Sequence, residues 1–467
     1  MKYTSFLVDE FSVIAIFNQL KSLFDERFLL LESMVHNENG NYSFIFIGEK
    51  ERVVYKNEKT YYFDGKKEHI LNKDPFSFFQ EYFKKIDFTK YKELSQKLNI
   101  AFVDGFVGYI GYDLVKVFEP VLKKVMDNLK DDIDIPDLYF IRPKIIIGYS
   151  HKFSTLTIII NDKDYEKYIY VIRDLINSTY THKPLKCIKG EIKERLLFNK
   201  EEFIELVKKA KEHIRAGDIF QIVLSNRLII EVDVDGFSFY RKLRSKNPSP
   251  YLFYLDYKDF ILTGSSPEVM VKLDDGEILL RPIAGTRKRG RTLKEDLALE
   301  EEMKNDEKEV AEHIMLVDLG RNDVGRVAKA GSVRVEELMR VERYSHVMHL
   351  VSDVVGEIDS KYDMFDLFKA TFTAGTMTGA PKIKAMELIA KYEGVKRGFY
   401  AGSVGYFGFN GNMDSAITIR SALIKDKKII LQAGAGIVAD SKPELEFKEI
   451  NNKLKALRTT IEELKCE

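Results

Sequence analysis

The chain has 467 residues, of which 45% are hydrophobic and 31% charged, and its 73 basic and 73 acidic residues leave no net charge. This is the composition of a globular protein, and the length predicts two closely packed domains or one large composite sheet. A nucleic-acid-binding protein would normally carry a basic surplus, which is absent here.

The apolar runs and the cysteines narrow the protein class further. Acidic residues interrupt the only apolar run near the N-terminus, so we expect no signal peptide. No stretch reaches the roughly 18 apolar residues of a membrane span. The two cysteines, Cys187 and Cys466, lie in no CxxC motif. We therefore expect neither a disulfide framework nor a zinc site, and a cytoplasmic protein.

The predicted elements divide the chain into three parts. Residues 1–180 contain β-branched and aromatic runs broken by Gly, Asn and Asp, which indicate strands of an N-terminal domain. Residues 181–200 lose this periodicity and are basic, as expected of a linker. Residues 201–467 begin with an amphipathic helix that ends near Gly217, and strands such as IFQIVLSNRLIIEV follow.

The rest of this third part alternates irregularly between helices and strands. We expect a long acidic helix at about residues 293–319 and a last helix at about residues 443–464. Because the elements do not follow a βαβ order, the sequence predicts an α+β fold with large, mostly antiparallel sheets.

Two of these helices carry glutamates at helical spacing. Glu446, Glu449 and Lys453 form a row beside the apolar stripe of the last helix, where a Glu449–Lys453 salt bridge is the simplest interpretation. Glu309 and Glu312 share one side of a helix that continues into the apolar segment IMLVDL. Carboxylates entering a buried segment need a partner. Two such pairs suggest a hard cation with oxygen ligands, such as Mg²⁺, bridging to an anionic substrate.

Two glycine-rich segments could approach an anion. TAGTMTGAP places Thr376 before a helix whose first turn contains Pro381, and free amides there attract a carboxylate or phosphate. AGAGIVAD contains Gly434 and Gly436 and nominally matches a dinucleotide motif, but no helix opens at its third position. These glycines either let the backbone approach a ligand or form a plain tight turn.

An arginine and a histidine stand out within apolar strand patterns. In MDSAITIRSALI, period-two alternation places Ala416, Thr418 and Arg420 on one face. An arginine there binds a ligand carboxylate or forms a structural pair with a glutamate. His349 lies in SHVMHLVSDVV, where a histidine satisfied within the core is the alternative to a catalytic one.

Seven motifs combine into a family resemblance. They are, in chain order, GSSPE, PIAGTR, AEHIMLVDLGRNDVG, ERYSHVMHLVS, AGTMTGAPKIKAMELI, YAGSVGYFGFNGNMDSAITIR and QAGAGIVADSKPELEFKE. Together they resemble the chorismate-utilising enzymes, and among them the large subunits of anthranilate synthase. The match is strong at about residues 198–464 and weaker before, through LLES at 30–33 and GFVGYIGYD at 105–113. It implies large sheets sandwiched by helices and, for residues 201–467, a chorismate-binding catalytic domain.

The resemblance also implies the roles of individual residues. Glu268 would protonate the departing ring hydroxyl as ammonia attacks ring carbon 2. His349, supported by Thr376, would remove the proton at that carbon as pyruvate leaves. The implied Mg²⁺ ligands are Glu309, Glu312, Glu446 and Glu449. The residues implied to position chorismate are Gly285, Thr286, Tyr400, Arg420, Gly434, Gly436 and Lys453.

The resemblance favours anthranilate as the product. Relatives that make aminodeoxychorismate often carry a lysine where this chain has Ala284, and those that make isochorismate or salicylate use a lysine where it has Gln221. Both absences favour ammonia as the direct nucleophile. Some aminodeoxychorismate synthases of the folate pathway lack that lysine, so this activity stays an alternative. A non-catalytic amino-acid-sensing subunit is the other alternative, although all four metal glutamates are present.

A separate glutamine amidotransferase subunit and a feedback inhibitor are further implications. The chain has no glutaminase signature, so it would use free ammonium unless such a subunit supplies ammonia.

In similar enzymes tryptophan binds where segments 30–33 and 247–253 meet. Here an apolar slot for the indole is expected, with Glu32 and Ser33 receiving the ammonium group. The expected contacts are Leu31, Glu32, Ser33, Pro250, Tyr251 and Leu252.

The alternative for these two segments is a strand end packed on the core and a rigid turn. Asn41 and Leu252 both depart from the residues usual in relatives, which weakens the case for tryptophan.

Overall fold

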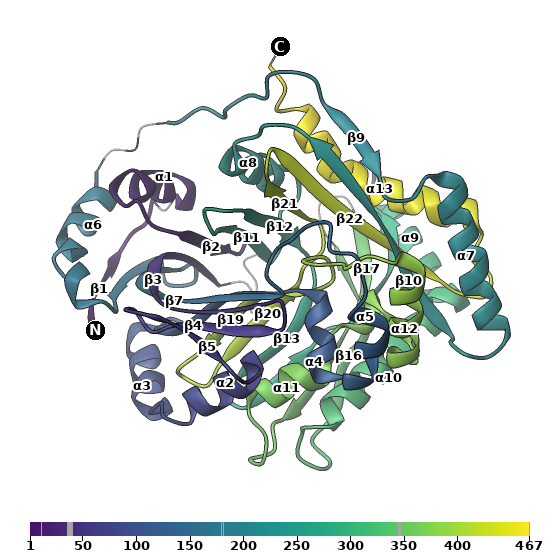
Figure 1. Cartoon of the computed structure of the whole chain (residues 1–467), viewed down its shortest axis with the longest axis horizontal. Helices are drawn as coiled ribbons and strands as arrows, with labels where there is room; N and C mark the ends of the chain where they lie inside the picture. Colours follow the sequence, from purple (N-terminus) through teal and green to yellow (C-terminus); the bar gives the residue numbers. More distant parts are fainter. Residues whose placement is uncertain (11, 35–40, 179, 181, 344–346, 467) are drawn as a thin grey trace.

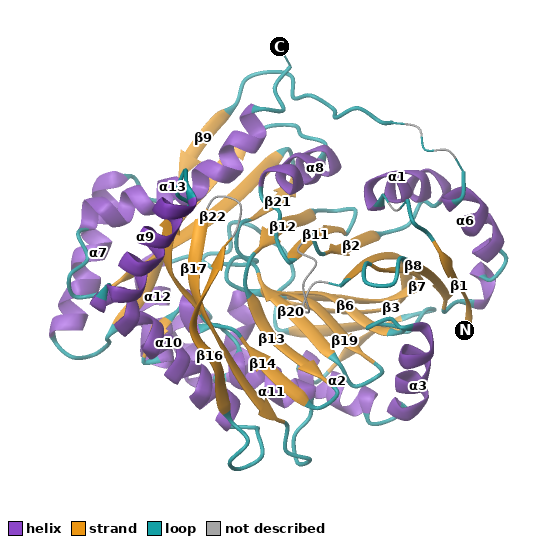
Figure 2. Ribbon diagram, turned by 180° about the vertical axis from the view of Figure 1, so that it is seen from behind, coloured by secondary structure: helices purple, strands orange, loops and turns teal. Residues whose placement is uncertain are grey.

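The computed structural model describes residues 1–10, 12–34, 41–178, 180, 182–343 and 347–466 (Figure 1). Its strands form one hydrogen-bonded network that divides into two sheets, which share the long strands β3 (Tyr42–Lys56) and β7 (Leu138–Ser150). Every ladder between the named strands of the described ranges is antiparallel, and helices cover the outside of the sheets (Figures 1 and 2). The predicted α+β fold with large antiparallel sheets is confirmed.

The first sheet joins strands from both halves of the sequence. Its order is β1 (Lys2–Leu7), β8 (Thr155–Ile160), β7, β3, β2 (Phe28–Glu32), β11 (Tyr251–Asp256), β12 (Ile261–Ser266), β21 (Ser421–Lys425), β22 (Lys428–Ile437), β10 (Gln221–Glu231) and β9 (Lys193–Leu196), with the short β18 (Gly379–Ala380) also on β10.

The second sheet leaves the shared strands in the other direction. Its order is β5 (Glu68–Leu71), β4 (Lys59–Phe63), β3, β7, β6 (Gly105–Ile110), β19 (Ser403–Gly408), β20 (Met413–Ile417), β13 (Val269–Asp274), β14 (Glu277–Leu280) and β17 (Val347–Glu357), with β15 (Ile283–Lys288) and β16 (Arg334–Arg343) on opposite edges of β17.

The helices of the described ranges follow no regular alternation with the strands. They are α1 (Val13–Leu23), α2 (Pro75–Phe83), α3 (Phe88–Leu98), α4 (Val115–Phe118), α5 (Lys123–Met126), α6 (Tyr168–Ile176), α7 (Lys200–Arg215), α8 (Gly236–Lys246), α9 (Leu293–Asn305), α10 (Glu307–Gly325), α11 (Met364–Thr371), α12 (Lys382–Glu393) and α13 (Pro443–Glu462). The helices predicted after the linker and at the C-terminal end are confirmed as α7 and α13.

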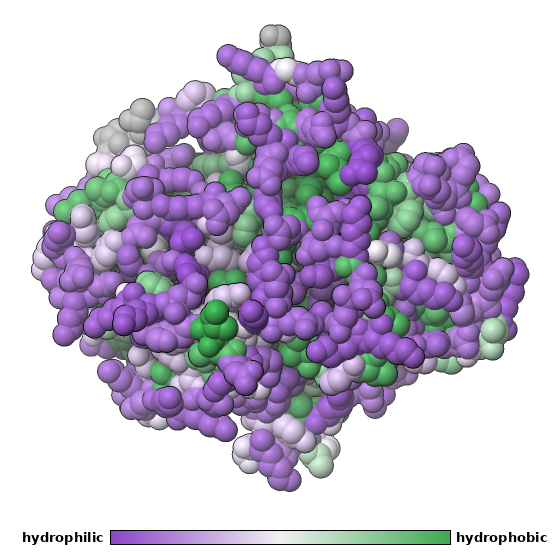
Figure 3. Space-filling view, in the orientation of Figure 1, coloured by the Kyte–Doolittle hydropathy of each residue, from purple (hydrophilic) through white to green (hydrophobic). Residues whose placement is uncertain are grey.

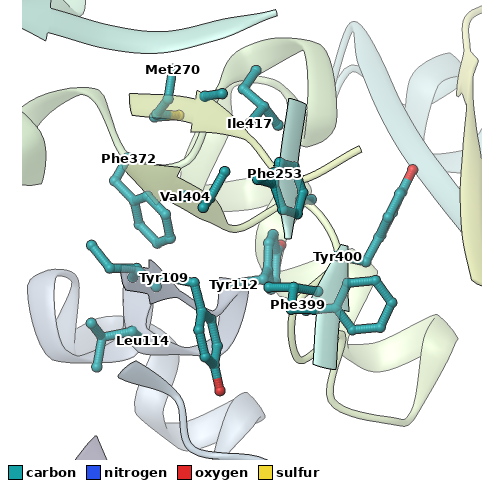
Figure 4. Packing of buried hydrophobic residues seen from close by; sticks show 14 of the residues in the cluster. Tyr109, Tyr112, Leu114, Phe253, Met270, Phe372, Phe399, Tyr400, Val404 and Ile417 are labelled. Carbon is teal, nitrogen blue, oxygen red and sulfur yellow. The ribbon is translucent and has the colours of Figure 1, made fainter. Parts of the chain in front are cut away.

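The main apolar core contains side chains of both sheets. Figure 4 shows Phe253 of the first sheet packed with Met270, Val404 and Ile417 of the second. A second cluster lies under α1, α6 and α8. Side chains alternate along β7, so this strand packs against both clusters. Ile146 faces the main core, and Ile145 and Ile147 face the second cluster.

The predicted long acidic helix is in fact two helices. It breaks at Asp306, whose side chain accepts hydrogen bonds from the backbone N–H groups of Lys308 and Glu309 and so caps α10. Aspartate is a strong N-cap, and here this preference overrides the helical pattern. The break fixes where the first turn of α10 begins, and Glu309 lies in that turn.

The predicted continuous strand through Arg420 also breaks. Residues 418–420 carry the chain from β20 in the second sheet to β21 in the first, and Arg420 has a positive φ of 49°. Period-two alternation therefore does not hold across this segment. The crossover places Arg420 between the two sheets rather than on a sheet face.

The expectation that the cysteines form no disulfide is wrong, because Cys187 and Cys466 are bonded across 279 residues of sequence. Residues 182–187 run over the outside of the molecule to the end of α13 (Figure 1). There the N–H of Ile188 donates to Leu464 O at 2.6 Å, and the N–H of Cys466 donates to Ile188 O at 3.1 Å. The cysteines therefore give no argument for a reducing compartment.

Within the described ranges, no helix is both long and apolar enough to cross a membrane. The face in Figure 3 is mostly hydrophilic, as the composition predicts.

Candidate active site

A cavity of about 640 Å³ lies between the inner ends of the sheets and the helices α10 and α13. These helices lie on the same side of the molecule as β17 and β22 (Figure 2). Every residue predicted for catalysis, for substrate or for the metal lines this cavity. Segments from residue 221 to residue 457 contribute to it, so the fold gathers the motifs of the second half at one place.

Glu268 is the buried acid of the cavity. It follows β12, is 7% exposed, and is held by the N–H of Ile417 on its carbonyl oxygen at 3.0 Å. Burial raises the pKa of its carboxyl to about 7, although a hydrogen bond from Thr376 Oγ1 to Oε1 at 2.8 Å acts in the opposite direction. A carboxyl with this pKa can donate a proton near neutrality.

Thr376 therefore contacts a different residue from the one predicted. We expected it to support His349, but its hydroxyl donates to Glu268, and the threonine beside His349 is Thr286. No local sequence pattern could assign these two threonines to Glu268 and His349, because the paired residues lie far apart along the chain.

His349 is the basic group of the cavity. It lies on β17 opposite Thr286 of β15, with Nδ1 at 3.0 Å from Gly285 O and 3.1 Å from Thr286 Oγ1. A carbonyl oxygen only accepts, so this contact favours the proton on Nδ1 and the lone pair on Nε2. Burial lowers the pKa of His349, which keeps the ring neutral and able to accept a proton near neutrality.

Arg420 is the cation best placed for an anionic ligand. Its guanidinium forms no ion pair among the described residues, although burial is sufficient to lower its pKa. The alternative of a structural Arg–Glu pair is thus contradicted. A buried cation without a counter-ion is costly, and a carboxylate in the cavity would offset that cost.

Two glycines of β22 allow close approach at the cavity wall. A Cβ at residue 434 would lie 2.9 Å from the Tyr400 hydroxyl, and one at residue 436 would lie 2.8 Å from Gln221 Nε2. Lys453 of α13 reaches the same strand, because its Nζ donates to Gly434 O at 2.9 Å. The glycines belong to a strand rather than a tight turn, so close backbone approach is the better interpretation.

The four glutamates line the cavity in two pairs, and each has a partner in the protein. Glu309 binds Arg287 at 3.0 Å, Glu312 accepts from Gln221 Nε2 at 2.9 Å, and Glu449 pairs with Lys453 at 2.7 Å. Glu446 is hydrogen-bonded to Ser441. The predicted Glu449–Lys453 salt bridge is thus confirmed. Among the described residues, no three acidic, histidine or cysteine side chains converge closely enough to hold a metal ion.

The chemistry of the four side chains nevertheless suits a hard cation. Burial is the main cause that raises the pKa of both Glu312 and Glu446, and the neighbouring carboxylate of Glu449 raises both further. Gln221 Oε1, beside Glu312, is buried without a hydrogen-bond partner among the described residues. A divalent cation with bound water would relieve both the repulsion and the missing hydrogen bond.

Arg287 is a residue of the cavity region that was not predicted from the sequence. Its guanidinium contacts Glu302, Asp306 and Glu309, so it holds the start of α10 against β15. The run of cations in TRKRG was a signal that a charged group is needed there.

A second cavity, of about 430 Å³, lies beside β2 and β11. These strands are paired, with Glu32 opposite Leu252, so the two predicted segments do meet. Leu31, Glu32, Ser33, Pro250, Tyr251 and Leu252 all line the cavity.

The carboxylate of Glu32, which was predicted to receive an ammonium group, already has partners in the protein. Its carboxylate is buried and accepts from Tyr240 Oη at 2.6 Å and from Arg244 at 2.5 and 2.7 Å. Asp274 and Asp414 are other carboxylates of the cavity wall. Like Glu32, both have partners in the protein: Asp274 pairs with Lys272 at 3.2 Å, and Asp414 accepts from Tyr251 Oη at 3.0 Å.

Comparison with known proteins agrees with this geometry. The family described as chorismate binding enzyme matches residues 26–459, and the chain belongs to this family. It is 46% identical to anthranilate synthase component 1 of Aquifex aeolicus, over 98% of this chain and 94% of that one.

Solved structures agree as well. The structure of anthranilate synthase component I from Streptococcus pneumoniae superposes with a TM-score of 0.78 at 33% identity, covering 91% of this chain and 94% of the other. A menaquinone-specific isochorismate synthase from Escherichia coli, at 19% identity and a TM-score of 0.72, covers 98% of this chain and 94% of its own and shows the fold alone.

Proposed function

We propose that the chain is the large subunit of an anthranilate synthase, which converts chorismate and ammonia to anthranilate, pyruvate and water in tryptophan biosynthesis. The observation that carries this proposal is that one cavity contains a carboxylic acid with a pKa of about 7 and an arginine that forms no ion pair among the described residues. The first can protonate a leaving hydroxyl, and the second can hold a carboxylate of the substrate.

The reaction proceeds in two steps. Ammonia attacks ring carbon 2, and Glu268 protonates the ring hydroxyl, which leaves as water. His349 then takes the proton from carbon 2 while the C–O bond to the enolpyruvyl group breaks, and the ring becomes aromatic. The released enolate takes up a proton and becomes pyruvate. Tyr400, Arg420 and Lys453 orient the substrate through its ring and carboxylates.

Two uncharged residues favour ammonia over other nucleophiles. Ala284 and Gln221 occupy the positions where relatives that make other products use a lysine, and both line the cavity. Neither can attack the ring or activate water as a lysine amine does. Gln221 Nε2 already donates to Glu312. Gln221 Oε1 has no hydrogen-bond partner among the described residues and can accept a hydrogen bond from the incoming ammonia.

We further propose that Mg²⁺ is the cofactor of this reaction. Glu309, Glu312, Glu446 and Glu449 would hold it after exchanging their present partners, directly or through water. Bound there, Mg²⁺ would neutralise a substrate carboxylate. The protein supplies the hard oxygen ligands at the cavity wall formed by α10 and α13.

A separate amidotransferase subunit would supply ammonia from glutamine. In the described ranges both cysteines are engaged in the disulfide, so neither is available as a glutaminase nucleophile. We place the enzyme in the cytoplasm, where its substrates are metabolised.

Tryptophan, as the end product, would bind the second cavity and inhibit. Apolar walls from β2 and β11 would receive the indole, while Asp274 or Asp414 would receive the ammonium group in exchange for its present contact with Lys272 or Tyr251. Inhibition requires that tryptophan bind an inactive state better, and by reciprocity chorismate would then weaken tryptophan binding.

Product analysis of the purified chain tests the proposal. With chorismate, Mg²⁺ and ammonium we expect fluorescent anthranilate, and with glutamine in place of ammonium we expect none. Aminodeoxychorismate or isochorismate as the main product would overturn the assignment. A chain that binds chorismate and tryptophan without turnover would instead be a sensing subunit.

A further inference from the structure

A fully buried ion pair lies directly behind the active-site cavity. Arg397 follows α12, and its guanidinium contacts Glu393 at the end of that helix through Nε at 2.8 Å and Nη2 at 2.6 Å. The side chains are 0% and 1% exposed. Neither residue lines the cavity, and the proposed reaction uses neither.

The remaining donors of Arg397 go to two walls of the cavity. Nη1 donates to Met377 O at 2.9 Å, and Nη2 donates to Val223 O at 2.8 Å. Both Met377 and Val223 line the cavity. Arg397 therefore ties the loop at residues 374–378 to β10, and Met377 directly follows the threonine that contacts Glu268.

The guanidinium also supports a substrate-facing ring. It lies 5.7 Å from the ring centre of Tyr400 and 4.8 Å from that of Tyr112. In Figure 4 Tyr400 stands at the edge of the core, with its hydroxyl pointing away from Phe399. A cation behind the ring fixes this orientation by cation–π attraction.

Glu393 extends the contact network along β10. Its Oε1 accepts from the N–H and the hydroxyl of Ser225, both at 2.8 Å, and Ser225 Oγ accepts from Gln432 Nε2 at 2.8 Å. Gln432 lies in the cavity wall on β22. The pair thus joins α12, β10, the 374–378 loop and Tyr400 around one point.

We propose that Arg397, held by Glu393, is a positioning residue that aims Thr376 at Glu268 and sets the ring of Tyr400. The inference rests on the proposed function, because it assumes that Glu268 is the acid of that reaction. Apolar side chains could hold these elements together without the desolvation cost of a buried charge pair. The planar fork of arginine instead provides donors in fixed directions, which lysine cannot reproduce.

The test compares Arg397→Lys with Arg142→Lys. Arg142 is a partly buried arginine, paired with Glu51 and Asp104 at 2.6 Å each, and it lies outside the active-site cavity. We expect both variants to lower Tm by similar amounts. Only Arg397→Lys should lower kcat, by about tenfold or more, because small misplacements of reacting groups are costly.

The pH profile separates positioning from simple stabilisation. The Thr376 hydrogen bond lowers the pKa of Glu268, so losing it should raise that pKa and move the alkaline loss of kcat to higher pH. Thr376→Val should show the same shift, and Arg142→Lys should show none. If Arg397→Lys does not fold, Glu393→Gln should likewise move the alkaline loss of kcat to higher pH.

An Arg397→Lys or Glu393→Gln enzyme with the wild-type pH profile, or an equal shift in Arg142→Lys, would overturn the inference. Those results leave the proposed function standing. Wild-type enzyme that makes no anthranilate would refute the proposed function instead.

Discussion

In the proposed reaction the residue that decides the chemistry is Glu268, because its surroundings rather than its type make it an acid at neutral pH. Burial raises its pKa to about 7, and only the protonated form can donate to the leaving hydroxyl. Activity should therefore fall as pH rises through about 7, when rates are compared at equal concentrations of unprotonated ammonia.

Replacing this carboxyl tests its role. Glu268→Gln should lower kcat by about 10²–10⁴-fold, the usual contribution of a general acid, and should abolish the alkaline limb. The measurement is the pH dependence of kcat for anthranilate formation. A Glu268→Gln enzyme that keeps the wild-type alkaline limb would assign that limb to another group.

The metal assignment is also decided at single residues. Glu449→Gln removes an anionic oxygen, so the Mg²⁺ dissociation constant measured by titration calorimetry should rise about 10–100-fold or more, and turnover should be nearly lost. Glu444→Gln makes the same change on α13 outside the cavity and should alter neither quantity. Equal Mg²⁺ affinity in the two variants would contradict the proposed site.

At this scale the sequence predicts the positions of functional residues better than their contacts. Helical spacing was enough to group Glu446 with Glu449, because the period is a property of one element. The Thr376–Glu268 contact joins residues 108 apart, and no local pattern encodes it. The ion-pair state of Arg420 likewise depends on which carboxylates the fold brings near.

At the scale of elements, the β2–β11 ladder forms one wall of the second cavity. Ser33 follows β2 and is buried at this wall. Ser33→Phe should fill the cavity, and the tryptophan concentration for half-inhibition should rise about tenfold or more, equal to at least about 1.4 kcal/mol of lost binding, with kcat unchanged.

Inhibition curves measure this effect, and Ser33→Ala, which adds no bulk, should remain sensitive. Unchanged inhibition of Ser33→Phe would place the inhibitor elsewhere. Failure of tryptophan to bind the wild-type chain would remove the regulatory proposal and leave the catalytic one intact.

The second element-scale feature is the disulfide that ties the linker to α13. Because it closes a very long loop, Cys466→Ser should lower the free energy of unfolding by about 2–4 kcal/mol. Thermal unfolding under non-reducing conditions gives the change in Tm. The double variant Cys187→Ser/Cys466→Ser should lose no more than the single one, and additive losses would mean that the cysteines act independently.

At the scale of the whole molecule, one strand of the second sheet, β20, contacts residues of both cavities. β20 carries Asp414, which accepts from Tyr251 Oη at 3.0 Å in the second cavity. Three residues later, the N–H of Ile417 binds the backbone of Glu268 in the first. The strand therefore connects the wall of the second cavity directly to the backbone of Glu268.

The overall architecture was only partly readable from the sequence. Strand patterns and irregular helix order predicted the antiparallel α+β class, because these are local signals. The crossover at residues 418–420 was missed, because an apolar run reads the same whether it stays in one sheet or passes between two. The disulfide was missed for the same reason, since only the fold brings the linker to α13.

The most direct test of the central claim follows the nitrogen atom from ammonia to product. Purified chain is incubated with chorismate, Mg²⁺ and ¹⁵N-labelled ammonium, and the products are identified by mass spectrometry. We predict ¹⁵N-anthranilate and pyruvate in equal amounts. Unlabelled aromatic product, isochorismate, or a ¹⁵N-labelled product that retains the enolpyruvyl group would contradict the account.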